Sequence, residues 1–254
     1  MRPLGSLISV SENWPKIPHL ITCTLYSHVG LRKWQLFINS GTVLATTEVL
    51  KGNIWTKSIK LPKPLARHCM LSLNRTHHIL LGGSESVKVG KPPDSKDTFS
   101  SSTYIYNNNK FREVASMATA RRSHGCAVVD ENVFIAGGFN GDRLSSVEYF
   151  SLTSLTWHTG PSLPFSTTYA RLIQIRGDLY FLGGYANGRK TKAIYHLETS
   201  SGKRVSNLRW KPVGNFKKPK MSFAALPLPW VKTVCNWFTF VNKNICLQCA
   251  KSFW

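Results

Sequence analysis

Short apolar runs recur along the chain in a pattern that predicts β-strands. Three of these runs, at residues 78–81, 133–136 and 179–182, are each followed directly by two glycines. The glycine pairs lie 55 and 46 residues apart. No window repeats apolar residues at positions i, i+3, i+4 and i+7 over three turns, as an amphipathic helix would. We therefore expect an all-β protein.

A large aromatic residue precedes each glycine pair at a nearly constant distance. The distances are 27, 26 and 26 residues, for Trp55 before Gly82, Phe111 before Gly137 and Trp157 before Gly183. Between the glycines and the next aromatic, a run rich in Tyr and β-branched residues, such as 146–150, indicates a further strand. Each period thus holds four short strands. A sheet of that size cannot cover both of its faces, so several must pack around a common centre as in a propeller.

The order of apolar strand, Gly-Gly, Tyr and Trp resembles the kelch repeat. The segment from Phe134 through Gly137-Gly138 and Glu148-Tyr149 to Trp157 matches that pattern most fully. The resemblance covers residues 31–230 and implies a kelch-type β-propeller of four-stranded antiparallel blades. We expect the second glycine of each pair to adopt positive φ, and the aromatic residues to fill the space between blades. The structural residues of the repeat are then Gly82, Gly83, Gly137, Gly138, Gly183, Gly184, Tyr149, Trp55, Trp157 and Trp210.

The repeat divides the chain into about four full units and a fraction. We expect an N-terminal segment at 1–30, units at 31–62, 63–118, 119–164 and 165–214, a partial unit at 215–241, and an irregular tail at 242–254. Kelch propellers commonly have about six or seven blades. The chain is therefore expected to form either a small ring of about five blades, which the N-terminal segment helps to close, or an incomplete propeller.

Charge is the one abnormal feature of the composition. The 254 residues include 33 Lys and Arg against 12 Asp and Glu, a net charge of +21 that attracts acidic proteins, nucleic acids or anionic membranes. Ten of the cations lie in the acid-free stretch 199–254, so the blades have a milder basic bias. Basic residues near Trp210 and Phe216 would suit single-stranded nucleic acid. No nucleic-acid-binding motif is present, however, and nucleic acid is kept only as an alternative partner.

The cysteines and the N-terminus indicate a cytoplasmic protein. The six cysteines stand at 23, 69, 126, 235, 246 and 249, and the first three are isolated, which favours buried reduced thiols over a disulfide framework. The sequence has neither a secretory signal nor an 18-residue apolar stretch that could span a membrane. The run Lys217-Lys218-Pro219-Lys220 keeps a nuclear location as an alternative.

Residues suited to catalysis are sparse. A copper-radical oxidase resembling galactose oxidase needs a Cys beside a Tyr and two further His ligands, but Cys69 and Cys126 lie at near-equivalent core positions of successive units. A sialidase needs motifs of the form Ser-x-Asp-x-Gly-x-Thr-Trp. The segment 151–157 resembles this motif but lacks both the Asp and the Gly. Cys246-x-x-Cys249 has the spacing of zinc ligands, and Cys235 lies eleven residues before Cys246, but a closed zinc site needs a fourth ligand that the sequence does not offer. We predict no catalytic residue, cofactor or metal, and keep an enzyme on a kelch-like scaffold as the alternative.

A protein-binding surface is the function that remains. In kelch proteins that capture peptides, the resemblance implies contacts just after the glycine pairs and at the start of each first strand. The residues at these positions are Arg67, His68, Arg121, Arg122, Ser123, Phe139, Asn140, Tyr169, Arg171 and Tyr185. Arginines among aromatic residues suit an acidic peptide, because guanidinium binds carboxylates in bidentate fashion. The alternative is that these arginines belong to the repeat itself and pair with Glu, and Glu148 is expected to be an ion-pair partner inside a blade.

The predicted function is therefore a non-catalytic protein–protein interaction module, an adaptor or scaffold for an acidic segment. Many kelch proteins are substrate receptors of cullin-based ubiquitin ligases and have a BTB domain upstream. About 30 residues precede the first predicted unit. That receptor role is expected only if the sequence is a fragment.

Overall fold

The computed structural model describes residues 20–25, 36–40, 45, 48–51, 54–57, 59–74, 76–85, 98–201, 204–222, 238–242 and 245–248. Within these ranges the regular structure is β-strand, apart from two single turns of 3-10 helix, η1 (Thr199–Ser201) and η2 (Val205–Asn207). The all-β prediction is confirmed. No helix in the described part of the chain is long and apolar enough to cross a membrane.

Four antiparallel sheets follow one another along the chain. The first contains β1 (Leu20–Leu25), β2 (Leu36–Ser40), β3 (Glu48–Lys51) and β4 (Ile54–Lys57). The second contains β5 (Cys69–Ser72), β6 (His78–Leu81), β7 (Thr103–Asn107) and β8 (Lys110–Val114). The third contains β9 (Gly125–Val129), β10 (Asn132–Ala136), β11 (Val147–Ser151) and β12 (Thr156–Gly160). The fourth contains β13 (Arg171–Ile175), β14 (Asp178–Leu182), β16 (Arg189–Leu197) and β17 (Lys211–Lys220), and the two-residue β15 (Tyr185–Ala186) pairs with the start of β16.

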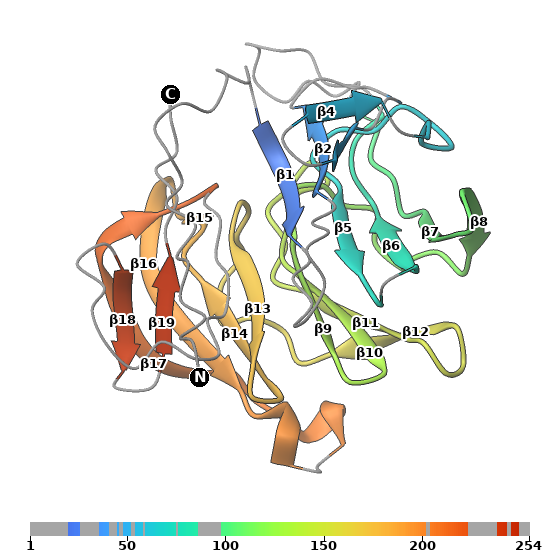
Figure 1. The fold of residues 1–254 in the computed structure, drawn as a ribbon. Helices are drawn as coiled ribbons and strands as arrows, with labels where there is room; N and C mark the ends of the chain where they lie inside the picture. The colour runs from blue at the N-terminus through green and yellow to red at the C-terminus, as the bar shows by residue number, and fades with distance from the viewer. Residues whose placement is uncertain are drawn as a thin grey trace, which may run out of the picture.

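The four sheets are the blades of a propeller, arranged around a common centre (Figure 1). The first strands β1, β5, β9 and β13 are innermost, and each contacts the next in that order. A further hairpin, β18 (Phe238–Asn242) and β19 (Ile245–Gln248), contacts β17. In the described part of the chain, four blades and one further hairpin agree with the predicted kelch-type propeller of about four to five blades.

Three boundaries differ from those drawn on the sequence. Blade 1 begins at β1, inside the segment expected to precede the first unit, because β1 pairs with β2 as the innermost strand. Blade 4 runs on to Lys220 rather than ending at 214, because Lys220 pairs with Thr191 of β16. Strand β19 lies in the tail expected to be irregular, and residues 223–237 of the predicted partial unit fall outside the described residues.

Both glycines of each pair adopt positive φ, not only the second. The φ angles are 57° and 110° at Gly82-Gly83, 65° and 107° at Gly137-Gly138, and 60° and 106° at Gly183-Gly184. The first glycine has no room for a side chain, since a Cβ on Gly82 would lie 2.6 Å from the carbonyl oxygen of Arg121. On Gly137 it would lie 2.8 Å from that of Thr167.

The second glycine of each pair hydrogen-bonds either the segment that follows its own blade or, in blade 4, the last residue of the outermost strand. The backbone N–H groups of Gly83, Gly138 and Gly184 donate to the carbonyl oxygens of Arg121, Thr167 and Lys220, each at 2.8 Å. Arg121 and Thr167 lead into the next blade. The glycine pair is therefore the backbone joint between neighbouring blades, where a Cβ would hold the two segments apart.

Tryptophans join the outer parts of the blades. Trp157 in β12 donates its indole N–H to the carbonyl oxygen of Ala115, at the end of the preceding blade, at 2.8 Å. Trp210, just before β17, donates in the same way to Pro161 at 2.8 Å. Tyr149 stacks on Phe134 with 5.2 Å between ring centroids, at the edge of the apolar core between blades 3 and 4. The side chain of Trp55 lies outside the described residues.

A disulfide between Cys69 and Cys126 links β5 to β9, with their Cα atoms 6.5 Å apart. This separation is within the usual range for a disulfide. The expectation of separate reduced thiols at these positions is corrected. The sequence separation of 57 residues conceals the pairing, since only the packing of neighbouring blades brings the two innermost strands together.

Candidate partner-binding face

One left-handed residue lies in each of the segments that lead into β5, β9 and β13, and another follows β17. These residues are Arg67 (φ 55°), Ser123 (φ 54°), Tyr169 (φ 57°) and, after blade 4, Ser222 (φ 48°). The N–H of Ser123 donates to Arg67, that of Tyr169 to Ser123, and that of Ser222 to Tyr169, at 2.9, 2.9 and 3.0 Å. Positive φ is uncommon outside glycine. Here a chain of backbone hydrogen bonds from blade to blade holds it in place.

These segments and the turns after the glycine pairs lie at the same end of the blades. We call this end the loop face, and it comprises residues 66–68, 82–85, 121–124, 137–143, 167–171 and 183–188. Strand pairing joins the two kinds of segment directly, because Arg122 and Phe139 exchange backbone hydrogen bonds at 3.0 and 2.9 Å. Thr168 and Tyr185 do the same at 3.2 and 2.7 Å.

Arginine side chains stack on aromatic rings across this face. The guanidinium carbon of Arg122 lies 5.2 Å from the ring centroids of both Phe99 and Phe139. In a second contact the exposed Arg143, in the turn of blade 3, lies 4.9 Å from the ring of Tyr185 in blade 4. Stacking occupies the flat face of the guanidinium. The N–H groups of Arg143, which lie in the plane of that group, can therefore still donate hydrogen bonds to other molecules.

Arg67 makes the same kind of contact with Tyr169, at 5.9 Å from the ring centroid. The two residues lead into blades 2 and 4, so this contact passes over blade 3. The sequence prediction missed Phe99 and Arg143. A signal was available for Arg143, which lies in the same post-glycine turn as the predicted Asn140.

The ten predicted partner-binding residues differ in their exposure. Asn140 is exposed. Arg67, Ser123, Phe139, Tyr169, Arg171 and Tyr185 are half-buried. His68, Arg121 and Arg122 are buried, at 6%, 0% and 4% exposure. His68, Arg121 and Arg122 are too buried to form a broad contact with a partner. The candidate contact residues are therefore the exposed Asn140, the six half-buried residues and Arg143.

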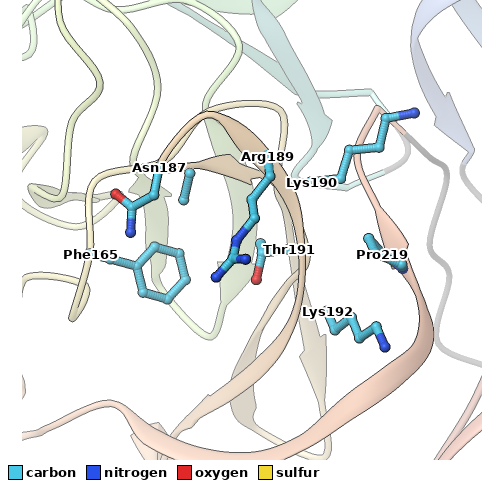
Figure 2. A pocket seen from close by; sticks show the side chains of 8 residues that line it. Phe165, Asn187, Arg189, Lys190, Thr191, Lys192 and Pro219 are labelled. Carbon is cyan, nitrogen blue, oxygen red and sulfur yellow. The ribbon is translucent and has the colours of Figure 1, made fainter.

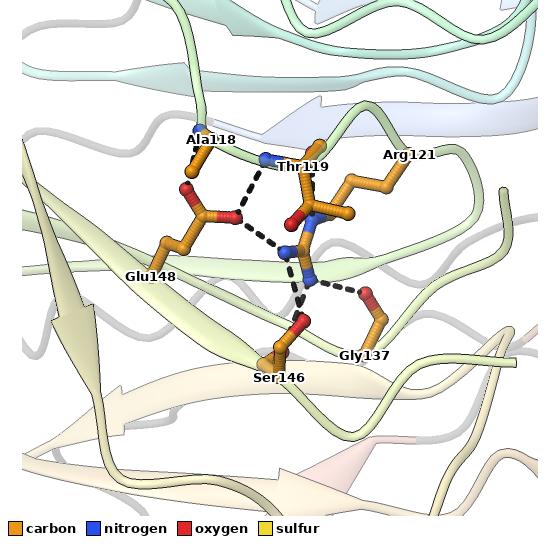
Figure 3. Close-up of polar contacts among 6 residues, drawn as sticks. All are labelled: Ala118, Thr119, Arg121, Gly137, Ser146 and Glu148. Carbon is orange, nitrogen blue, oxygen red and sulfur yellow. Dashed lines mark hydrogen bonds and ion pairs between the residues drawn. The ribbon is translucent and has the colours of Figure 1, made fainter.

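Arg121 is instead part of a buried polar network inside blade 3 (Figure 3). One guanidinium nitrogen donates to the carbonyl oxygens of Gly137 and Ser146, at 2.8 and 3.0 Å. The other donates to the Ser146 hydroxyl at 3.0 Å and forms an ion pair with Glu148. Burial lowers the pKa of Arg121 from its usual value, and the carboxylate of Glu148 opposes that effect.

Glu148 satisfies its remaining acceptor capacity on the segment before Arg121. Its carboxylate accepts backbone N–H bonds from Ala118 at 2.7 Å and Thr119 at 3.2 Å. The predicted role of Glu148 as an ion-pair partner within a blade is confirmed. The network connects the segment between blades 2 and 3 to the glycine turn and to β11, which makes it structural.

Two buried histidines sit beside the left-handed residues. Burial lowers the pKa of His68 to about 4. Burial also lowers the pKa of His124 to about 3, and the nearby charges of Arg121, His68 and Arg171 act in the same direction. Both imidazoles are therefore neutral at pH 7, and the predicted contact residue His68 brings no positive charge to the face.

These shifts make stability dependent on pH. Because the unfolded chain binds protons near pH 6.5 and the folded chain does not, the free energy of unfolding should fall as the pH drops from about 6.5 toward about 4. Each histidine contributes a slope of about 1.4 kcal/mol per pH unit within that window. The free energy of unfolding, measured by urea denaturation at several pH values, should change less steeply with pH for His124→Leu than for the natural chain. Equal slopes would contradict the assignment.

Among the described side chains, no group of three or more His, Cys, Asp or Glu residues could hold a metal ion. The side chains of Cys235, Cys246 and Cys249, weighed above as zinc ligands, lie outside the described part of the chain.

Known proteins with related sequences share the repeat. A protein-family model described as the Kelch motif matches residues 120–164, which is blade 3. Kelch-like protein 41b of Danio rerio is 26% identical over 189 residues, covering 71% of this chain and 30% of the relative. Kelch-like protein 40 of Mus musculus is 32% identical over 152 residues, covering 59% of this chain and 22% of the relative.

A solved structure supports the fold. The "Structure of YjhT" superposes with a TM-score of 0.62 at 14% sequence identity, covering 80% of this chain and 67% of that one. Fold, repeat and sequence similarity together show a kelch-type β-propeller. The chain spans less than a third of the length of the two Kelch-like relatives.

Proposed function

We propose that this propeller is a non-catalytic module that binds an acidic segment of another protein on its loop face. The observation that carries the proposal is the set of arginine–aromatic contacts there. Arg143 on Tyr185 and Arg67 on Tyr169 present cationic groups held in place by rings, and Asn140 adds an exposed amide. Arginines oriented in this way lose little side-chain freedom when they bind carboxylates.

The distribution of carboxylates favours the same face. Asp130 and Glu131 lie in the β9–β10 turn at the opposite end of blade 3, and Asp178 begins β14 at the opposite end of blade 4. On the loop face, Glu85 is neutralised by an ion pair with Lys63. Asp142 remains beside Arg143, in an exposed turn. Among the described residues, an acidic partner therefore meets fewer carboxylates on the loop face than on the opposite face.

The relatives are named Kelch-like proteins and are longer than this chain. An adaptor or scaffold role, in which the propeller selects a partner for a larger protein or assembly, extends the proposal. Fold alone does not assign that role. Binding by the propeller is the part that can be tested on the chain itself.

The test is affinity capture from a cell lysate with three purified forms of the chain. One variant carries Arg67→Ala, Arg143→Ala and Arg171→Ala on the loop face. The control carries Arg176→Ala, Arg204→Ala and Arg209→Ala, which removes the same charge from exposed sites elsewhere on blade 4. We expect the first variant to lose a partner about tenfold and the control to keep it. Equal capture by all three forms, or equal loss in both variants, would overturn the choice of face.

A further inference from the structure

A cleft of about 430 Å³ opens on blade 4 beside the loop face (Figure 2). The residues that line it are Phe165, Ala186, Asn187, Arg189, Lys190, Thr191, Lys192 and Pro219. Three of these described lining residues are cationic, and none of them is acidic. Figure 2 shows Arg189 extending on the side of Phe165, whereas Lys190 and Lys192 lie toward Pro219.

Strand register separates the charges of blade 4 along its length. The cleft is formed by the start of β16, which pairs with β15, and Thr191 there pairs with Lys220 of β17. At the other end of β16, His196 contacts the carboxylate of Asp178 at 2.9 Å. Lys211 lies 3.6 Å from Glu198 at that same end. These two ion pairs of blade 4 thus lie at the end of β16 that is farther from the cleft.

Strand β17 adds further positive charge next to the cleft. Lys217 and Lys218 are exposed, and they precede Pro219, which lines the cleft. Lys220 follows at the end of the strand. In the sequence these lysines belong to the acid-free basic stretch after residue 199. Pairing of β17 with β16 brings them beside cations that precede that stretch.

The cleft is continuous with the loop face. The N–H of Thr191 donates to the carbonyl oxygen of Gly184 at 2.9 Å, and the Tyr185 hydroxyl donates to Gly188 at 2.8 Å. Tyr185 is also the ring on which Arg143 stacks. One chain of contacts therefore leads from the turn of blade 3 to the wall of the cleft.

We propose that this cleft is a second anchoring site, where an acidic peptide segment of a protein partner places its carboxylate groups. The proposal rests on the proposed function and extends it outward from the loop face. Arg189 and Lys192 supply the charge, and Asn187 and Thr191 supply neutral hydrogen-bonding groups. Sites that bind single-stranded nucleic acid use a series of exposed aromatic rings. Among the described residues that line this cleft, Phe165 is the one aromatic residue, and its ring already packs edge-on against Phe181 and Tyr195.

The experiment measures binding of a fluorescein-labelled peptide of about eight glutamates by fluorescence anisotropy. The cleft variant is Arg189→Ala with Lys192→Ala. The matched control is Lys110→Ala with Arg112→Ala, two exposed cations in β8 of blade 2. We expect the cleft variant to bind about three- to tenfold more weakly than the natural chain, and the control to stay within about twofold.

Three results would overturn the proposal. Equal weakening in both variants would show that the peptide responds only to the overall positive charge. Unchanged binding in the cleft variant would place the site elsewhere. Tighter binding of a single-stranded oligonucleotide of equal charge, lost in the cleft variant, would assign the cleft to nucleic acid.

The loop-face variant separates this proposal from the proposed function. If Arg67→Ala, Arg143→Ala and Arg171→Ala abolish peptide binding while the cleft variant keeps it, the loop face is the site and the cleft is not. If partner capture is unaffected by the loop-face variant, the proposed function fails, whatever the peptide does at the cleft. Circular dichroism on the cleft variant should match the natural chain, since Arg189 and Lys192 are exposed. The same measurement on the loop-face variant checks that loss of the half-buried Arg67 and Arg171 leaves the fold intact.

Discussion

Replacing Glu148 by Ala should lower the free energy of unfolding by about 3–5 kcal/mol, as measured by urea denaturation at pH 7. The change leaves the fully buried guanidinium of Arg121 without its counter-ion. It also removes the acceptors for the backbone N–H groups of Ala118 and Thr119. An unpaired charge inside a protein is among the most destabilising defects that a single substitution can create.

Two controls make this result specific. Glu113→Ala removes a carboxylate from the exposed side of β8 and should change the free energy of unfolding by about 0.5 kcal/mol or less. The double variant Arg121→Met, Glu148→Leu removes both charges and should be less destabilised than Glu148→Ala alone. If Glu148→Ala were as mild as Glu113→Ala, the network would not be the structural connection that we describe.

Replacing Gly137 by Ala should cost about 3 kcal/mol of stability. A Cβ there would lie 2.8 Å from the carbonyl oxygen of Thr167, at the joint between blades 3 and 4. The φ of +65° adds a penalty of about 1–2 kcal/mol for a residue other than glycine, and overpacking adds about 1–3 kcal/mol. The measurement is again urea unfolding, with near-UV circular dichroism reporting whether the aromatic packing between the blades is kept.

Gly188→Ala is the matched control for this prediction. Gly188 has a similar φ of +74°, but a Cβ there would meet nothing within 4 Å. This variant should therefore show the backbone penalty of about 1–2 kcal/mol without the clash. Equal losses for the two variants would mean that conformation alone, and not the close approach of neighbouring blades, requires glycine in the pair.

The blades could be predicted because their pattern is local. The apolar run, the glycine pair and the aromatic residue that follows the pair all fall within one repeat, and each has a direct physical role in the structure. Where the pattern is degraded, as around β1 and β17, the predicted boundaries shifted by up to about ten residues. Strand pairing rather than sequence motif decides where those blades begin and end.

Features that depend on contacts between repeats could not be predicted in the same way. The burial of Arg121 and the partnership of Cys69 with Cys126 both require knowing which segments of neighbouring blades meet. The sequence left two roles open for the repeated arginines, pairing with Glu inside the repeat or binding an acidic partner. Each arginine charge needs either a counter-ion within the blades or exposure to solvent. Nothing local distinguished Arg121, which is buried with Glu148, from the adjacent Arg122, which lies between two rings.

The basic cleft shows the same limit. Its cations belong to β16, its proline belongs to β17, and its aromatic wall belongs to the segment before β13. The run Arg189-Lys190-x-Lys192 was visible in the sequence. Its proximity to Pro219 and Phe165 depends on the register of β16 with β17 and on the turn formed by β15.

Site-specific photo-crosslinking tests the central claim most directly. A photoreactive amino acid is introduced at Asn140, exposed on the loop face, or at Glu131, exposed in the β9–β10 turn at the opposite end of the same blade. Each chain is irradiated in a cell lysate, and the crosslinked proteins are identified by mass spectrometry. We predict a partner with an acidic segment crosslinked from position 140 and absent from position 131. The same partner crosslinked equally from both positions, or from position 131 alone, would contradict binding on the loop face.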